Sequence, residues 1–158
     1  MTVEILVDTN VLVYAYDRSE PEKQNRALDV LDRLRLTGKG GLSTQVLSEF
    51  FNATMRKLAA PLTLEQAYTR LEHYVRFWPV FEVTSDVILE AVRGVRDYAF
   101  NFWDAQIWAV ARLYGIGVII SEDFNSGSTI EGVAFINPFS SDFYPQFLQS
   151  LPSAYGEV

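Results

Sequence analysis

The chain has 158 residues and a net charge of −7, and 49% of its residues are hydrophobic, which is typical of one folded globular domain and excludes a disordered chain. Cysteine is absent and His73 is the single histidine, so disulfides and thiolate chemistry are excluded and any bound metal must rely on oxygen ligands. No apolar run reaches the ~18 residues of a membrane span, and the N-terminus lacks a signal-peptide pattern. We therefore expect a cytoplasmic protein.

Short apolar segments alternate with amphipathic segments along most of the chain. Strands are expected at 3–8, 40–44, 79–83, 117–121 and 133–136, and helices at 11–16, 21–36, 45–59, 63–78, 86–98 and 102–114. This alternation predicts an α/β fold, with a mostly parallel central sheet flanked by helices in a single domain over residues 1–139. We expect a loop at 125–129, and a C-terminal tail at 140–158 that packs on the domain or is partly mobile.

Local signals set the ends of several expected helices. Asn10 is predicted to cap the first helix, and Asn101 the helix that Gly115 ends. Thr63 and Gln66 have the spacing of a capping box, in which each side chain bonds the backbone of the other residue. In the helix at 21–36, an apolar stripe is expected to face the core; it consists of Ala27, Leu28, Val30, Leu31 and Leu34.

Four carboxylates follow strands or begin helices, where functional groups of α/β sheets gather. Asp8 ends the first strand, and Asp123 lies just past the strand at 117–121. Glu49 lies early in the helix after the second strand, and Asp104 lies in the first turn of the helix at 102–114. Sites in open α/β sheets form outside the carboxyl ends of the strands, so we expect these acids to converge there.

Such a cluster of like charges needs a cation. Two unit charges ~4 Å apart repel by roughly 4 kcal/mol at an effective dielectric constant of about 20, and several such pairs would rival the stability of a whole domain. A divalent ion removes this repulsion, and carboxylate ligands favour Mg²⁺ or Mn²⁺. A metal so placed can activate water for phosphodiester cleavage.

Each acid also has a structural interpretation when it is taken alone. Asp8 can cap a helix, Asp104 can complete a cap, Glu49 can be a solvated helix residue, and Asp123 can belong to a polar loop beside Glu122. The site prediction therefore depends on the joint pattern of the four acids.

Other conspicuous residues have a mainly structural interpretation. His73 lies among apolar residues in its helix and is expected to be structural. The aromatic residues Phe100, Phe102, Trp103 and Trp108 are expected in the core, although one ring at the rim could stack on a base. All 13 Lys and Arg residues lie at or before Arg112, so any phosphate-binding surface must come from that part of the chain; the candidates are Arg18, Lys23, Arg26, Arg33, Arg35, Lys39, Arg56 and Lys57.

The joint pattern resembles the PIN domain, a family of metal-dependent nucleases that includes the VapC-type toxins of prokaryotic toxin–antitoxin pairs. The resemblance spans residues 3–139. It depends on the segments VDTNVLVYA, SEFFN, FWDAQIWAVA, IISEDF and INPF, in this order.

The resemblance implies roles for the acids as the catalytic and metal-binding set. Asp8 and Asp104 would bind the metal most directly, Glu49 would bind it or orient the attacking water, and Asp123 would complete the shell. Asp123 is preferred over Glu122 because the family places its last acid two residues beyond a Ser or Thr, here Ser121. The implied polar support consists of Thr9, Asn10 and Ser121.

The resemblance further implies endonucleolytic cleavage of RNA by metal-activated water, a homodimer, and an antitoxin that inhibits the protein by presenting a basic residue near the acids. A non-toxin PIN nuclease of RNA processing, or a PIN scaffold that binds RNA or protein without cutting, are the alternatives. A receiver domain is disfavoured because Thr9 stands where a second acid is needed and no Lys follows Lys57. Asn10 disfavours a phosphatase with an Asp nucleophile.

Overall fold

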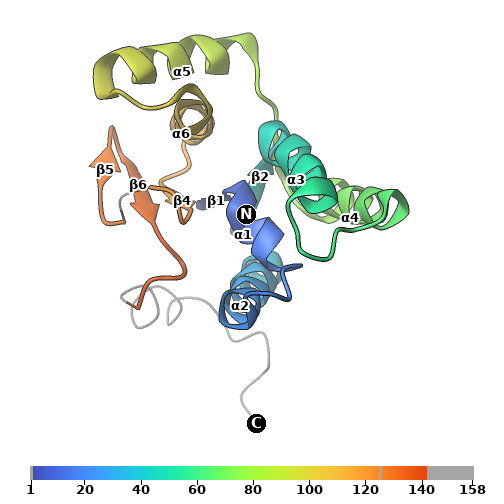
Figure 1. The fold of residues 1–158 in the computed structure, drawn as a ribbon. Coiled ribbons are helices and arrows are strands. Elements are labelled where there is room, and N and C mark those ends of the chain that lie inside the picture. Colours follow the sequence, from blue (N-terminus) through green and yellow to red (C-terminus); the bar gives the residue numbers. More distant parts are fainter. Residues whose placement is uncertain (1, 125, 142–158) are drawn as a thin grey trace.

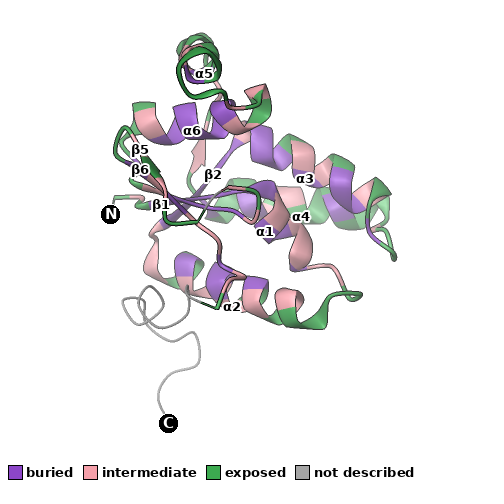
Figure 2. Cartoon of the chain, turned by 60° about the vertical axis from the view of Figure 1, so that its left-hand side comes forward, coloured by how far each residue is buried: buried purple, intermediate pink, exposed green. Residues whose placement is uncertain are grey.

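A six-stranded sheet lies between helices in the computed structural model of the chain, which describes residues 2–124 and 126–141 (Figure 1). The strands are β1 (Ile5–Val7), β2 (Gly40–Ser43), β3 (Val80–Phe81), β4 (Val118–Ile120), β5 (Thr129–Ile130) and β6 (Val133–Ile136). The helices are α1 (Thr9–Tyr14), α2 (Pro21–Thr37), α3 (Thr44–Arg56), α4 (Leu64–Phe77), α5 (Ser85–Tyr98) and α6 (Phe102–Tyr114). Figure 2 shows α2 below the sheet and α5 and α6 above it. The predicted α/β architecture is confirmed.

The sheet has the order β3-β2-β1-β4-β6-β5, and every neighbouring pair is parallel except β5 and β6. In its centre, Val7 of β1 pairs with Ile120 of β4. The next amide along β1, that of Asp8, donates a hydrogen bond to the Ile120 carbonyl at 3.0 Å. The two residues that follow these strands, Asp8 and Ser121, therefore leave the sheet side by side at its carboxyl edge.

Several predicted helix caps are confirmed, and the predicted cap of α1 is wrong. The capping box of Thr63 and Gln66 is formed, and Asn101 caps α6. At α1, however, the cap is Asp8, whose Oδ1 accepts a hydrogen bond from the Thr9 amide at 2.7 Å, whereas Asn10 lies inside the helix. The reason is that β1 ends at Val7, one residue earlier than expected, so Asp8 is the last extended residue before the turn into α1.

Residues 129–130 form β5, although a loop was expected over 125–129. The strand makes a tight antiparallel hairpin with β6 across Glu131 and Gly132, whose φ angles are +49° and +83°. Two consecutive positive φ angles define the type I′ turn that suits the twist of a hairpin. This turn was not predicted from the sequence, because its first position holds Glu131 in place of the usual Asn, Asp or Gly.

The buried core lies on both faces of β1 and β4 (Figure 2). Its largest buried side chains are Trp108, Phe50 and Phe135. Two core predictions were wrong. Trp103 is 61% exposed at the first turn of α6, where it lines the pocket described below, and Leu28 is 45% exposed on α2. His73 contacts the rings of Tyr74 and Phe77 on α4.

No helix in the described part of the chain is long and apolar enough to cross a membrane. The cytoplasmic location and the domain boundary at residue 139 stay predictions. The behaviour expected for the tail at 140–158 concerns mainly residues 142–158, which lie outside the described residues.

Substitution of Gly40 by Ala will destabilise the fold. An added Cβ would lie 2.7 Å from Cζ3 of Trp78 and 2.8 Å from Cβ of Leu34, too close for either buried group. We expect the free energy of unfolding, measured by urea denaturation, to fall by about 1–3 kcal/mol. Gly117→Ala is the matched control, because its Cβ would meet no atom within 4 Å. Equal effects of the two substitutions would contradict the close packing around β2.

Candidate functional site

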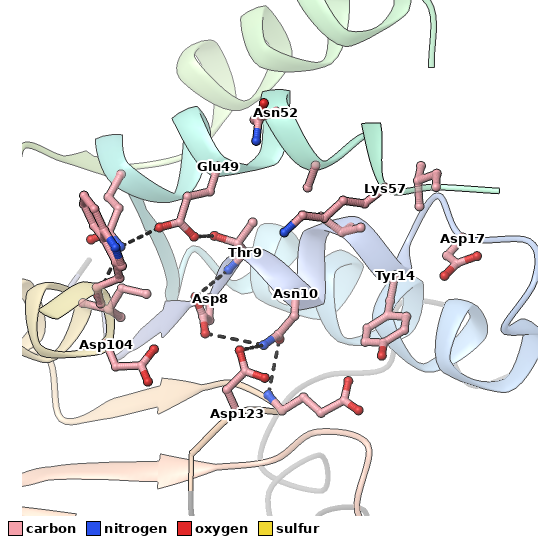
Figure 3. A pocket seen from close by; sticks show the side chains of 17 residues that line it. Asp8, Thr9, Asn10, Tyr14, Asp17, Glu49, Asn52, Lys57, Asp104 and Asp123 are labelled. Carbon is pink, nitrogen blue, oxygen red and sulfur yellow. Dashed lines mark hydrogen bonds between the residues drawn. The ribbon is translucent and has the colours of Figure 1, made fainter. Parts of the chain in front are cut away.

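A pocket of about 690 Å³ opens at the carboxyl edge of the sheet, and all four predicted acids line it (Figure 3). Asp8 comes from the end of β1, Glu49 from α3, Asp104 from the first turn of α6, and Asp123 from the segment after β4. Acids that lie far apart in the sequence therefore face one cavity, as the sequence predicted. Their catalytic and metal-binding roles stay predictions.

Asp8 lies at the floor of the pocket with only 3% of its surface exposed. Its Oδ1 accepts from the Thr9 amide at 2.7 Å, and its Oδ2 accepts from the Ser121 hydroxyl at 2.6 Å. Burial raises the pKa of Asp8 to about 7, and these two hydrogen bonds only partly offset the effect. A carboxylate without a cationic partner is therefore costly to ionise at this position.

Asn10 connects the acids on one side of the pocket. Its Nδ2 lies 3.1 Å from Oδ2 of Asp123, 3.2 Å from Oγ of Ser121 and 3.5 Å from Oδ2 of Asp8. Its Oδ1 accepts a hydrogen bond from the Glu122 amide at 3.3 Å, which fixes the orientation of the side-chain amide. A neutral donor thus stands between two carboxylates and reduces their repulsion without carrying a full charge.

Glu49 is held by two donors, and one of them, Gln45, was not predicted from the sequence. Oε2 accepts from the Thr9 hydroxyl at 2.8 Å, and Oε1 accepts from Nε2 of Gln45 at 2.6 Å. Gln45 is itself fixed, because it donates to the Trp103 carbonyl at 3.1 Å and accepts from Gln106 at 2.7 Å. Both glutamines are buried. This network sets the direction in which Glu49 points.

The sequence did contain signals for these two glutamines. Gln45 precedes Glu49 by four residues, which places both side chains on the same face of α3. Gln106 interrupts the apolar run of α6 two residues after Asp104, and a polar side chain buried in an apolar helix face needs a hydrogen-bond partner.

Asp104 takes part in a helix cap and also lines the pocket, so both its structural and its functional interpretation remain in place. Its amide donates to Oδ1 of Asn101 at 3.0 Å, and its Oδ2 accepts from Nδ2 of Asn101 at 2.6 Å, so it belongs to the cap of α6. It is half-buried and also lines the acidic pocket. Burial raises the pKa of Asp104 above its ordinary value despite the bond from Asn101.

The structure distinguishes Asp123 from its neighbour Glu122. Glu122 forms an ion pair with Lys23 of α2 at 2.7 Å, and Lys23 also donates to the Tyr14 hydroxyl at 3.2 Å. Asp123 instead accepts from Asn10 and lies with the other acids. The charge of Glu122 is therefore compensated within the chain, whereas Asp123 has a neutral partner in Asn10.

The donor chemistry of the pocket fits a divalent cation such as Mg²⁺ or Mn²⁺, because the four acids supply only oxygen atoms. Within residues 2–124 and 126–141, no three Asp, Glu or His side chains already lie close enough together to hold a metal ion. Binding would therefore require side chains to turn inward. Asp123, which is exposed, and Asp104, which is half-buried, have the freedom to do so.

Comparisons with known proteins agree with this architecture. The family model of the PIN domain matches residues 5–126. No curated protein sequence gives a significant match to the chain.

Solved structures share the fold. A DNA-bound VapBC complex from Salmonella typhimurium matches with a TM-score of 0.62 at 15% identity, over 86% of this chain and 98% of that chain. A toxin–antitoxin complex from Klebsiella pneumoniae gives 0.59 at 16% identity, over 86% and 98%. VapC20 from Mycobacterium tuberculosis, described as a toxin that cleaves the sarcin-ricin loop, gives 0.58 at 22% identity, over 80% and 97%. At identities this low, the likeness shows the fold alone.

Replacement of Asp8 by Asn will change how stability depends on pH in the presence of a chelator. The pKa of Asp8 rises from 3.8 to about 7 on folding, so the folded chain keeps a proton that the unfolded chain loses in this pH range. Stability contributed by this group is thus present at pH 4 and is lost as the pH rises through about 7. We expect Asp8→Asn to be more stable than the parent at pH 8 by about 1–4 kcal/mol, and the difference to shrink toward pH 5.

The measurement is urea denaturation of both proteins in excess EDTA from pH 5 to pH 8. Glu82→Gln, which removes an exposed carboxylate outside the pocket, is the control and should show no such trend. A stability difference between Asp8→Asn and the parent that stays constant with pH would contradict the buried, uncompensated state of Asp8.

Proposed function

The chain belongs to the PIN-domain family, and on this basis we propose that it is a metal-dependent endoribonuclease that hydrolyses RNA phosphodiester bonds and acts as the toxin of a toxin–antitoxin pair. The observation that carries the proposal is the gathering of Asp8, Glu49, Asp104 and Asp123 around one open pocket. Asp8 and Asp104 also cap helices, but capping does not require four acids in one pocket, where their mutual repulsion and the burial of Asp8 destabilise the fold. Binding of a divalent cation and a phosphate group would explain why they are there.

In this proposal the four acids hold Mg²⁺ or Mn²⁺, and Asp8 and Asp104 are the most direct ligands. When bound, the metal lowers the pKa of a water molecule and stabilises negative charge on the phosphate oxygens. The chain itself positions the groups around the reaction. Asn10 orients the Asp8 and Asp123 carboxylates. Thr9 and Gln45 orient the Glu49 carboxylate through hydrogen bonds. In this orientation Glu49 can accept a proton from the attacking water.

The phosphate backbone of an RNA substrate is negatively charged, and one end of the pocket carries a basic side chain that can bind it. Lys57 follows the last turn of α3, is exposed, and lines the same pocket as the acids (Figure 3). Lys23 of α2 is engaged by Glu122. Lys57 is therefore the residue that we expect to contact a phosphate beside the scissile bond.

An antitoxin partner is proposed from the family and from the solved structures of the same fold, several of which are toxin–antitoxin complexes. A basic side chain of such a partner would find four carboxylates in a pocket open to solvent. A homodimer is also implied by the family and stays a prediction. A non-toxin PIN nuclease and a PIN scaffold that binds RNA or protein without cutting are the alternatives that the experiments below separate.

The nuclease activity can be tested directly on purified protein. We expect cleavage of 5′-labelled structured RNAs with Mn²⁺ or Mg²⁺, no cleavage with EDTA, and a loss of at least about 100-fold in Asp104→Asn, because a ligand is lost. The control is Asp86→Asn, which neutralises an exposed carboxylate on α5 outside the pocket and should cleave like the parent. Persistent cleavage in EDTA or in Asp104→Asn would reject the metal-dependent mechanism.

The toxin role has a separate test in cells. Induced expression of the chain should arrest growth of a bacterial host, and Asp104→Asn, produced to the same level, should not, because arrest depends on RNA cleavage. Growth is followed by optical density and colony counts, with Asp86→Asn as the active control. RNA cleavage in vitro without any effect on growth would favour a nuclease of RNA processing over a toxin.

A further inference from the structure

Trp103 is an exposed tryptophan beside a candidate catalytic acid. Its side chain is 61% exposed, whereas the other two tryptophans, Trp78 and Trp108, are 6% and 0% exposed. Its ring contacts that of Phe102 edge-on, with the centroids 5.1 Å apart. The backbone at this position is fixed, because the Trp103 carbonyl accepts a hydrogen bond from Gln45. The chain thus presents a large aromatic ring at the rim of the acidic pocket without burying it.

A second hollow adjoins the acidic pocket at this ring. It has a volume of about 460 Å³, and Trp103, Gln45, Glu49 and Asn52 line both cavities. The second hollow adds the hydroxyls of Thr44 and Ser48. A ligand in the acidic pocket can therefore extend past Trp103 into a neighbouring space that carries polar groups beside the apolar face of the ring.

We propose that Trp103 is a stacking platform for one unpaired base of an RNA substrate, next to the phosphodiester that is cut. The inference deepens the proposed function and rests on it. Every base has an apolar π-face, so an exposed aromatic ring binds single-stranded RNA without requiring one sequence. The ring lies one residue before Asp104, so a base stacked on it belongs to a nucleotide at or beside the one whose phosphate meets the acids.

The hollow also supplies groups for the edge of that base. Within the part of the chain that the structure describes, the side-chain amide of Asn52 is exposed and has no hydrogen-bond partner. The Ser48 hydroxyl donates to the Thr44 carbonyl and keeps its own lone pairs free to accept. A donor and an acceptor thus lie in the space beside Trp103, and they match the mixed donors and acceptors of a base edge.

Electrostatics favour a base over other groups here. A base is neutral, so it does not suffer the repulsion that the acids exert on a phosphate. The surroundings also differ from those of a protein-binding hot spot, where an aromatic anchor enters a desolvated pocket depleted of charge. Apart from Val83 and Trp103 itself, the hollow is lined by hydroxyl, amide and carboxylate side chains.

Fluorescence tests binding without catalysis. Because Trp78 and Trp108 are buried, Trp103 dominates the solvent-accessible emission. In EDTA and low salt, an unstructured RNA hexamer should quench this emission saturably, and the same sequence in a perfect duplex should not, since its bases are already stacked. Absence of quenching by the single strand would overturn the proposal.

Kinetics test the same ring during turnover. Trp103→Leu should raise KM for an RNA with an unpaired cleavage site by about 5- to 100-fold, as expected for one lost stacking contact. Trp103→Phe should restore most of the affinity. The matched control is Tyr68→Leu, which removes a ring that is 62% exposed on α4, away from both cavities, and should leave KM unchanged. Circular dichroism confirms that each variant folds.

The outcomes separate this inference from the proposed function. Normal RNA cleavage with an unchanged KM in Trp103→Leu would overturn the base site and leave the nuclease intact. Quenching by single-stranded RNA without cleavage under any metal would support the base site and reject the nuclease. If Trp103→Leu instead changed the mass measured by light scattering and left RNA binding unaltered, the ring would be a protein contact, and the proposal would be wrong.

Discussion

The site depends on the parallel pairing of β1 with β4 in the middle of the sheet. Because Val7 is in register with Ile120, the chain leaves both strands at the same edge, and Asp8 and Ser121 meet there. The pairing fixes one acid rigidly at the floor of the pocket. The other three acids arrive on α3, on α6 and on the segment after β4, and each of these is anchored to the same core.

The sheet brings like charges together, and the surrounding polar groups reduce the resulting repulsion. Asn10 stands between Asp8 and Asp123, Thr9 and Gln45 hold Glu49, and Asn101 holds Asp104. All of these partners are neutral, so they orient the carboxylates without neutralising them. The raised pKa of buried Asp8 therefore remains, and it reflects a free energy that a cation would recover on binding.

Much of the fold was predictable because its signals are local. Caps, the capping box and the apolar periodicity of single helices predicted the element order, and the family model matching residues 5–126 confirms the resemblance noted in the sequence. The positions of the four acids at segment ends were enough to predict that they share an edge of the sheet, although their roles stay predictions.

The errors came from relations that no local pattern encodes. Asp8 replaced Asn10 as the cap of α1 because the strand ends one residue early. The exposure of Trp103 and the contacts of Gln45 and Gln106 depend on how α3 and α6 lie relative to each other, which only the assembled fold shows.

The two strands at the edges of the sheet, β3 and β5, are short, and this affects how the protein behaves in concentrated solution. Each offers only two residues of backbone to a neighbouring molecule, so within the described residues intermolecular strand addition at the sheet edges, the usual route to fibrillar aggregates, has little template.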